Sequence, residues 1–201
     1  MAANDLVTVT QVEAHLDIPT GTGDATQLGN QIEVASQLIE DFLDRKLIEQ
    51  SHTDYYDGRR SDRLILRQWP VSAITELRLD STNGFTEAST LVDSSDYALV
   101  NDQEIVLLNG GTFHYGRYSV KVIYTAGWLQ ASIPATIRNA CLQLVEYLED
   151  RRTDRDIGRK SKSKGGESIV LVEGIPELIA LQLQPYKRIQ FALGEVAIGN
   201  G

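Results

Sequence analysis

Apolar residues recur at helical spacing near the start of the chain. Asp24 is a suitable N-cap residue, and the apolar positions after it predict an amphipathic helix of about four turns. Those positions are Leu28, Ile32, Ala35, Leu38, Ile39, Phe42 and Leu43. Upstream, Thr10 and Glu13 have the spacing of a capping box, which predicts a short helix that ends at Leu16 or Asp17. The chain up to about residue 48 is therefore expected to be helical.

Between about residues 50 and 130 the period of the pattern changes to two. Short runs alternate apolar and polar side chains, as half-buried strands do, and glycine-containing turns separate some of them. The runs cover residues 63–67, 74–80, 97–100, 104–108 and 118–124. The Asn83–Gly84 pair suits a turn with positive φ. These runs predict a small antiparallel sheet.

A helical pattern returns at Pro134, which suits the first position of a helix because proline lacks the N–H that would be unpaired there. This helix is expected to end near Arg152. Residues 153–168 contain almost no apolar side chains and predict a mobile basic loop. After this loop, residues 168–172 could form a strand, and Pro176 begins a short helix through Leu183.

The expected fold class is α+β, with an antiparallel helical core of about four helices and a β-rich insertion between the second and third helices. The expected divisions are a helical core over residues 1–152 with the sheet inserted at about 50–130, and the mobile basic loop at 153–168. A C-terminal strand, helix and tail occupy 169–201. A chain of 201 residues is long enough to bury a hydrophobic core.

Charge is distributed unevenly along the chain. The formal net charge is −9, from 19 Lys and Arg against 28 Asp and Glu, which is the wrong sign for binding nucleic acid by phosphate neutralisation. Residues 1–57 hold 11 acidic and 2 basic side chains, whereas residues 151–164 hold 7 basic and 2 acidic ones. The sequence shows no apolar run long enough for a membrane span and no signal-peptide pattern at its start. The single cysteine, Cys141, fits a reducing cytoplasm.

No catalytic, cofactor-binding or metal-binding motif stands out, so we expect no enzyme activity and no cofactor. His15, His52 and His114 lie far apart and have no zinc-ligand spacing. Residues Asp54, Asp57 and Asp62 could bind Ca²⁺ or serve a small metal-dependent hydrolase, but a charged hairpin tip with both signs is the favoured interpretation.

The basic segment leaves three interpretations open. It is a solvated loop, a contact for an acidic surface on another subunit, or the nucleic-acid contact of a DNA-binding regulator. It has no interleaved aromatic residues for base stacking. Its basic residues are Arg151, Arg152, Arg155, Arg159, Lys160, Lys162 and Lys164.

Several stretches, taken in their order along the chain, resemble one known family. Residues 7–16 and 24–47 resemble its first two helices, and residues 68–77, with Trp69-Pro70-Val71, resemble the stretch that leads into a strand. The most specific matches are residues 123–128, 133–140 and 147–151, and residues 175–188 resemble its closing helix and Pro-Tyr-Arg-like end. The family is that of the head–tail connector (adaptor, or head-completion) proteins of long-tailed bacteriophages and prophages.

This resemblance implies a structural protein of the virion neck that is assembled in the host bacterial cytoplasm. Such adaptors form a ring, commonly a dodecamer, beneath the portal protein. They extend the DNA channel and provide a platform for the next neck or tail-completion protein. Genomic DNA passes through without specific binding, and no membrane is involved.

The resemblance also implies that the C-terminal segment docks on the portal. The alternative is that this segment packs back onto its own domain. The portal-contact candidates are Tyr186, Arg188, Ile189 and Phe191.

Acidic side chains that face the channel would repel phosphates and let a duplex slide through. On this reasoning we expect acidic residues of the second helix to line the lumen of the ring. The candidates are Glu33, Glu40, Asp41 and Asp44.

Overall fold

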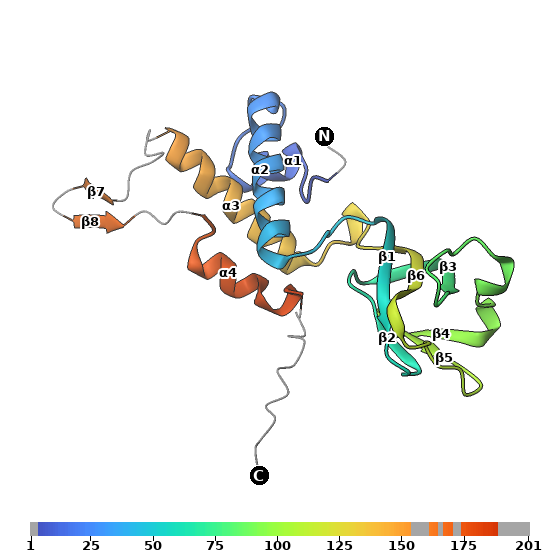
Figure 1. The fold of residues 1–201 in the computed structure, drawn as a ribbon. Helices are drawn as coiled ribbons and strands as arrows, with labels where there is room; N and C mark the ends of the chain where they lie inside the picture. The colour runs from blue at the N-terminus through green and yellow to red at the C-terminus, as the bar shows by residue number, and fades with distance from the viewer. Residues whose placement is uncertain (1–3, 154–160, 165–166, 171–173, 189–201) are drawn as a thin grey trace, which may run out of the picture.

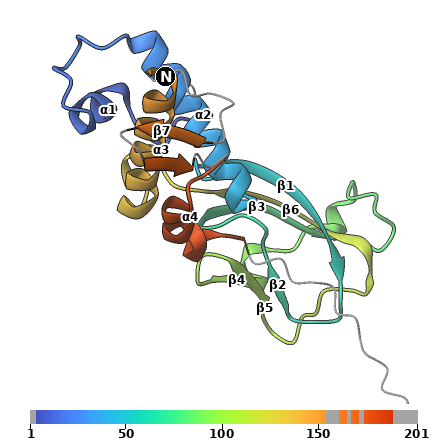
Figure 2. The same cartoon turned by 90° about the vertical axis from the view of Figure 1, so that its left-hand side faces the viewer.

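The computed structural model describes residues 4–153, 161–164, 167–170 and 174–188 (Figure 1). A helical half and a half built of strands lie next to each other, and each has its own cluster of buried apolar side chains. The same division is visible after a quarter turn, with the helices at one end of the molecule and the two larger sheets at the other (Figure 2).

The helical half contains α1 (Val9–His15), α2 (Ala25–Leu43), α3 (Ala135–Thr153) and α4 (Glu177–Leu183). The side chain of Asp24 caps α2 by accepting hydrogen bonds from the N–H groups of Thr26 and Gln27, as expected for an Asp at this position. The apolar stripe of α2 packs against α3, which α2 crosses in Figure 1, and α4 packs on α3. Buried residues of this core include Ile32, Ile39, Ile137, Leu144 and Leu183.

The first helix begins two residues earlier than the capping box expected from the sequence. Thr8 is the N-cap, and its hydroxyl and the side chain of Gln11 form the reciprocal pair of hydrogen bonds. Glu13 is instead buried, and its carboxylate accepts hydrogen bonds from the backbone N–H of Gly21 and of Gly23. The residue expected to cap α1 therefore anchors the loop between α1 and α2.

The β half contains two three-stranded antiparallel sheets. The first has the order β1–β6–β3, from β1 (Gln50–Gly58), β6 (Gly116–Ala126) and β3 (Val71–Leu79). The second has the order β2–β5–β4, from β2 (Arg63–Ile65), β5 (Glu104–Leu107) and β4 (Tyr97–Val100). Apolar side chains of both sheets share one core, which includes Leu66, Leu77, Ile105, Val120 and Tyr124.

The fold class expected from the sequence is therefore wrong. That expectation was an antiparallel helical core with a small β-rich insertion between the second and third helices. The structure has four helices in the described part of the chain together with two three-stranded sheets, and strands form a large share of the molecule. The physical reason is that the two sheets bury their apolar faces against each other and so form a second hydrophobic core.

Short 3₁₀ turns and a hairpin complete the fold. The turns are Ala88–Thr90, Ser94–Asp96, Gln130–Ser132 and Gln184–Tyr186. Strands β7 (Ser161–Lys164) and β8 (Glu167–Val170) pair as an antiparallel hairpin. Most of the expected mobile basic loop, namely residues 154–160 and 165–166, lies outside the described residues. None of the described helices combines the length and the apolar character that a membrane crossing requires.

Candidate functional site

The helical half meets the first sheet directly after α2. Asp44 ends this helix in the left-handed region, at φ 54°, which turns the chain sharply. The carboxylate of Glu40 is buried and accepts hydrogen bonds from Lys46 Nζ at 2.7 Å and from the backbone N–H of Leu47 at 2.9 Å. Glu40 therefore holds the segment that leads from the helix into the sheet.

Two chain segments cross where this connection enters the sheet. The N–H of Trp128 donates to the carbonyl of Leu47 at 2.8 Å, and the N–H of Glu49 donates to the carbonyl of Trp128 at 2.9 Å. Gly127 has a φ of +113°, and a Cβ at this position would lie 2.6 Å from the carbonyl oxygen of Ile48. Only glycine fits this crossing without a shift of the backbone.

The side chain of Arg45 lies at the centre of the junction. Its guanidinium lies 3.4 Å from the ring centroid of Trp69 and 4.8 Å from that of Trp128, and it also donates a hydrogen bond to the carbonyl of Trp69. The two rings meet edge to face, with their centroids 5.9 Å apart. Burial lowers the pKa of Arg45 to about 9, although the nearby carboxylate of Glu40 acts in the opposite direction. We call Arg45, Trp69 and Trp128 the junction cluster.

The C-terminal segment is attached to the same place. The ring of Tyr186 packs edge to face on Trp128, with the centroids 6.3 Å apart. The backbone N–H of Arg188 donates to the carbonyl of Leu43 at 3.0 Å, and its guanidinium lies 3.5 Å from the carboxylate of Asp44. The described chain thus ends beside the last turn of α2, and the C-terminal tail starts there.

Comparison with known proteins identifies the family. The sequence model of the head completion protein family matches residues 5–189, which is most of the chain. The chain belongs to this family. Membership of the head completion proteins confirms the expected resemblance and the expected role as a structural head–tail connector of the virion neck. No curated protein matches the chain.

Solved structures of gene transfer agent particles contain chains with a similar fold. One chain from the neck of an empty gene transfer agent particle, computed with C6 symmetry, is 20% identical with a TM-score of 0.62, and the match covers 96% of each chain. A chain from the neck of the native particle, computed with C12 symmetry, is 19% identical with a TM-score of 0.62 and the same coverage. A chain from the native virion of a gene transfer agent is 18% identical with a TM-score of 0.60, over 96% of this chain and 95% of the other.

The portal-contact candidates divide into two pairs in this head completion protein. Tyr186 is half-buried against Trp128, and Arg188 is tied to the end of α2, so both hold the start of the tail. Ile189 and Phe191 lie outside the described residues.

The structure places the four acidic lumen candidates in different environments. Glu33 and Asp41 are exposed on one stripe of α2. Asp44 is exposed but lies beside Arg188. Glu40 is buried and bonded to Lys46 and Leu47, so it does not belong to an exposed acidic face.

The three aspartates considered for a hydrolase do not form a metal centre. Asp54 accepts hydrogen bonds from the hydroxyls of Tyr56 at 3.1 Å and Tyr124 at 2.7 Å, whereas Asp57 accepts one from the backbone N–H of Tyr118. Burial and the charge of Asp54 raise the pKa of Tyr56 to about 12. Among the described residues, no group of three or more His, Cys, Asp or Glu side chains is arranged to hold a metal ion.

The remaining candidates also have structural surroundings. His15 Nε2 lies 2.9 Å from the carboxylate of Glu146 on α3, and His52 packs beside Tyr124. Burial raises the pKa of the Cys141 thiol to about 12, which fits its place on the buried stripe of α3. In the basic segment, Arg152 pairs with Glu149 at 2.7 Å, and the side chains beyond residue 153 lie outside the described part.

Sequence reasoning did not find the junction cluster as a unit. Arg45, Trp69, Trp128 and Tyr186 all lie in stretches that carry the resemblance to the family. The signal that could have found the cluster is chemical: the chain has only two tryptophans, each inside one of those stretches, and arginine stacks well on aromatic faces.

Proposed function

We propose that the protein assembles into a ring beneath the portal protein, extends the DNA channel of a phage-like head, and offers a platform to the next neck or tail-completion protein. The observation that carries this proposal is the match of the head completion family over residues 5–189. The necks that contain the similar structures were computed with C6 and C12 symmetry, which supports a ring and favours a dodecamer. The role is structural and requires no catalytic group.

We propose that the C-terminal tail contacts the portal. Support comes from the way the chain is held just before the tail, because Tyr186 and Arg188 fix its starting point at the end of α2. Beyond Arg188 the apolar residues Ile189 and Phe191 alternate with polar or small ones, a pattern that suits pairing with an extended partner segment. Packing of this tail onto its own domain is the competing outcome.

We further propose that the exposed acidic stripe of α2 faces the channel. Glu33 and Asp41 carry this proposal, because both are exposed and lie two helical turns apart on the same side of the helix. Carboxylates in the lumen would repel DNA phosphates, so the duplex would pass without being held.

The test of ring formation is measurement of particle mass by size-exclusion chromatography with light scattering. The purified protein is measured alone and after mixing with purified portal rings. We expect a mass increase that corresponds to a ring of subunits on each portal. Absence of any association with the portal, across salt and protein concentrations, contradicts the proposal.

Two variants separate the finer proposals. A chain that ends at Arg188 should keep its fold and lose portal binding, whereas unchanged binding contradicts the role of the tail. The Glu33→Lys/Asp41→Lys double variant, assembled on the portal, should retain duplex DNA at low salt, while the wild-type assembly does not. Equal retention of DNA by both assemblies contradicts the acidic lumen.

A further inference from the structure

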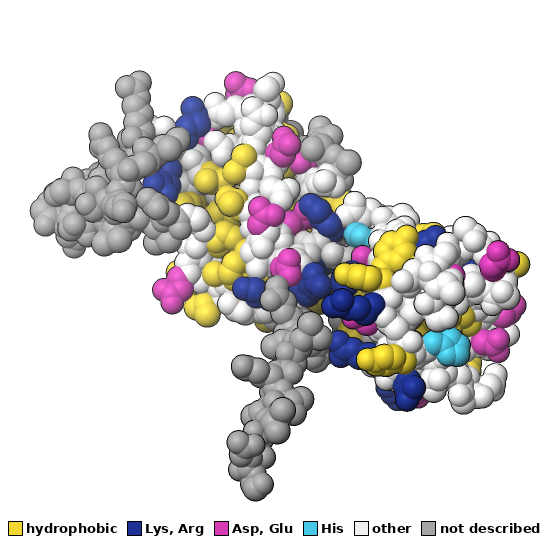
Figure 3. Space-filling model, in the orientation of Figure 1, with side chains coloured by type: hydrophobic (Ala, Val, Ile, Leu, Met, Phe, Trp, Pro, Cys, Tyr) yellow, Lys and Arg dark blue, Asp and Glu magenta, His cyan; other side chains and the backbone are white. Residues whose placement is uncertain are grey.

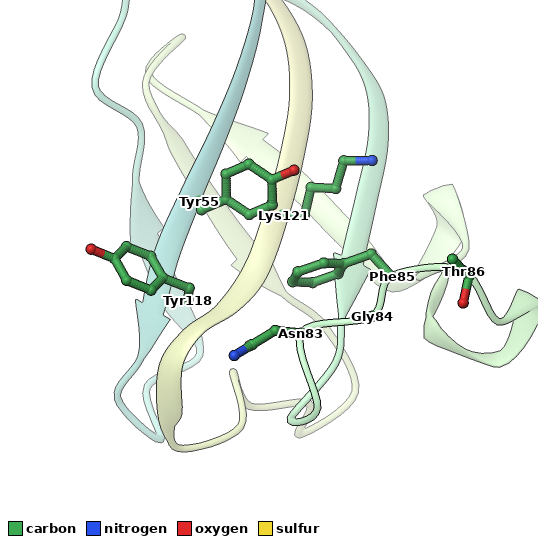
Figure 4. Close-up of a pocket in the computed structure, with 7 residues that line it drawn as sticks. All are labelled: Tyr55, Asn83, Gly84, Phe85, Thr86, Tyr118 and Lys121. Carbon is green, nitrogen blue, oxygen red and sulfur yellow. The ribbon is translucent and has the colours of Figure 1, made fainter.

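An open hollow of about 580 Å³ lies on the first sheet of the β half (Figure 4). Tyr55 from β1, Tyr118 from β6 and Phe85 from the loop after β3 form its aromatic walls, and Lys121 lies at its edge. The rings of Tyr55 and Phe85 contact each other with their centroids 5.6 Å apart. The hollow thus combines apolar walls with one cation.

The loop that supplies Phe85 is held in place by Asp80. The carboxylate of this residue accepts hydrogen bonds from the N–H groups of Thr82, Gly84 and Phe85 at 2.7, 3.0 and 2.8 Å. Hydrogen bonds to the charged form, above all from Thr82, lower the pKa of Asp80 to about 2. These three hydrogen bonds hold the loop in the position from which Phe85 lines the hollow.

Three residues of the hollow have left-handed backbone conformations. The φ angles are 61° at Asn83, 51° at Phe85 and 51° at Tyr118. For bulky side chains such as Phe and Tyr this conformation is strained, and strain of this kind concentrates at binding sites. The N–H of Tyr118 donates to Asp57 at 2.8 Å, which helps to hold this conformation.

The walls of the hollow have the composition of a protein-binding surface. Tyr118 is 59% exposed, and it lines the hollow together with Tyr55 and Phe85. Exposed Tyr is a frequent centre of binding energy in protein interfaces. The Nζ of Lys121 lies 3.5 Å from a carboxylate oxygen of Glu76. Because an ammonium group has three hydrogen-bond donors, Lys121 can also bind a carboxylate of a partner. A matching partner presents aliphatic side chains next to a carboxylate.

A surface with exposed aliphatic side chains next to a carboxylate is present in the helical half of the same chain, on α4. On α4, Leu178 is 76% exposed and Leu181 is 60% exposed, three residues apart on one side of the helix, and Glu177 precedes them. The opposite side of α4 buries Ile179 and Leu183 in the helical core. Figure 3 shows hydrophobic side chains on the surface of the helical half as well as on the β half. We call Glu177, Leu178 and Leu181 the α4 edge.

One copy cannot bring these two surfaces together. Figures 1 and 2 place α4 in the helical half, whereas the loop after β3 projects from the β half on the side away from the helices. Contact is therefore possible only between copies, and it joins two different surfaces. A contact of this kind, repeated head to tail, closes into a ring when the rotation between copies allows it.

We propose that the hollow binds the α4 edge of a second copy of this chain. In this contact Leu178 and Leu181 occupy the space between Tyr55, Phe85 and Tyr118, and Glu177 pairs with Lys121 of the neighbouring copy. The inference rests on the ring of the proposed function and specifies which surfaces join its subunits.

The test is cross-linking between two variants of different size, each with one added cysteine. Tyr118→Cys and a tagged Leu178→Cys chain are mixed, assembled on the portal and treated with a short bis-maleimide. We expect a covalent pair of one tagged and one untagged chain, and no pair from either variant alone. Because the native Cys141 is buried, it contributes no background in the folded protein.

Leu129→Cys provides a matched control, because Leu129 is 61% exposed but lies outside the α4 edge. It should give no pair with Tyr118→Cys. Independently, Leu178→Asp should weaken ring assembly about tenfold or more, whereas Leu129→Asp should leave it unchanged. Tryptophan fluorescence and circular dichroism check that each variant is folded.

The outcomes separate this inference from the proposed function. A ring that forms without the mixed cross-link, and that tolerates Leu178→Asp, overturns the inference and leaves the proposed function standing. A cross-link from Tyr118→Cys to the portal instead of a second copy also overturns the inference. A sample that forms no ring at all overturns both.

Discussion

Replacement of Arg45 by methionine tests whether charge or volume matters at the junction cluster. Burial lowers the pKa of Arg45 from 12.5 to about 9, which corresponds to a cost of about 5 kcal/mol for keeping the guanidinium charged in this place. Stacking on two tryptophan rings and a charged hydrogen bond to the carbonyl of Trp69 together contribute about 5 kcal/mol. The two contributions nearly cancel.

We therefore expect Arg45→Met to change the free energy of unfolding by no more than about 1 kcal/mol, because methionine keeps most of the buried volume. Arg45→Ala should lower the free energy of unfolding by about 3 kcal/mol, because it leaves a cavity beside the rings of Trp69 and Trp128. Arg117→Met serves as the control, since Arg117 is exposed, and it should leave stability unchanged.

The assay is urea unfolding followed by tryptophan fluorescence. Trp69 and Trp128 are the two tryptophans of the chain, and both belong to the junction cluster, so the signal reports directly on this site. Circular dichroism measured in parallel shows whether the whole molecule unfolds in the same transition. If Arg45→Met is as unstable as Arg45→Ala, the charge itself stabilises the junction and the reasoning above is wrong.

The pH dependence provides an independent check. Burial acts to lower the pKa of Arg45, whereas stacking and the hydrogen bond favour the charged guanidinium and act to raise it. Because these contributions nearly cancel, we expect the difference in unfolding free energy between wild type and Arg45→Met to stay constant up to about pH 11. If burial prevails, the unfolded state alone binds the proton and stability rises with pH, so a gain of wild type over Arg45→Met above about pH 9 contradicts the balance.

Three further predictions concern single positions. Gly127→Ala should lower the free energy of unfolding, measured in urea, by about 3 kcal/mol, because the added Cβ would collide with the backbone at a φ of +113°. Gly29→Ala on α2 is the control: its Cβ meets nothing within 4 Å, so the free energy of unfolding should rise by about 0.5 to 1 kcal/mol. Glu40→Ala should lower the free energy of unfolding by about 3 kcal/mol, because it leaves a buried backbone N–H and a lysine without their acceptor. The same change at exposed Glu33 should alter the free energy of unfolding by no more than about 0.5 kcal/mol. Equal effects of the two substitutions contradict the role assigned to Glu40. Cys141 should resist a thiol reagent in the folded protein and react only as fast as the chain unfolds, which the rate of modification measures.

Local signals predicted the elements whose stability comes from neighbouring residues in the chain. The N-cap at Asp24 and the apolar stripe of α2 are confirmed, because capping and helical periodicity act over a few residues. The turn at Asn83 also has the positive φ that its Asn-Gly sequence indicates. In contrast, β1 (Gln50–Gly58) was not expected as a strand, since many of its side chains are polar and it is held by pairing with the distant β6.

The predicted fold class was wrong for the same reason, because strand pairing joins segments that are far apart in the chain. Alternating patterns identify strands, but they do not say which strands pair. Strand β2 (Arg63–Ile65) pairs with β5, about forty positions later in the chain. The second sheet that results packs on the first, and the two form a separate hydrophobic core. The sequence reading therefore expected one small inserted sheet where the structure has two.

The sequence by itself determined the family, the connector role and the segregation of acidic and basic residues, because these depend on residue order and composition. Tertiary structure decided how the acidic residues are used, burying Glu40 at the junction while leaving Glu33 exposed. It also decided that Arg45, Trp69 and Trp128 meet, although up to 83 positions separate them. Such a contact depends on how two hydrophobic cores are placed against each other, and packing of that kind leaves no periodic signal in the chain.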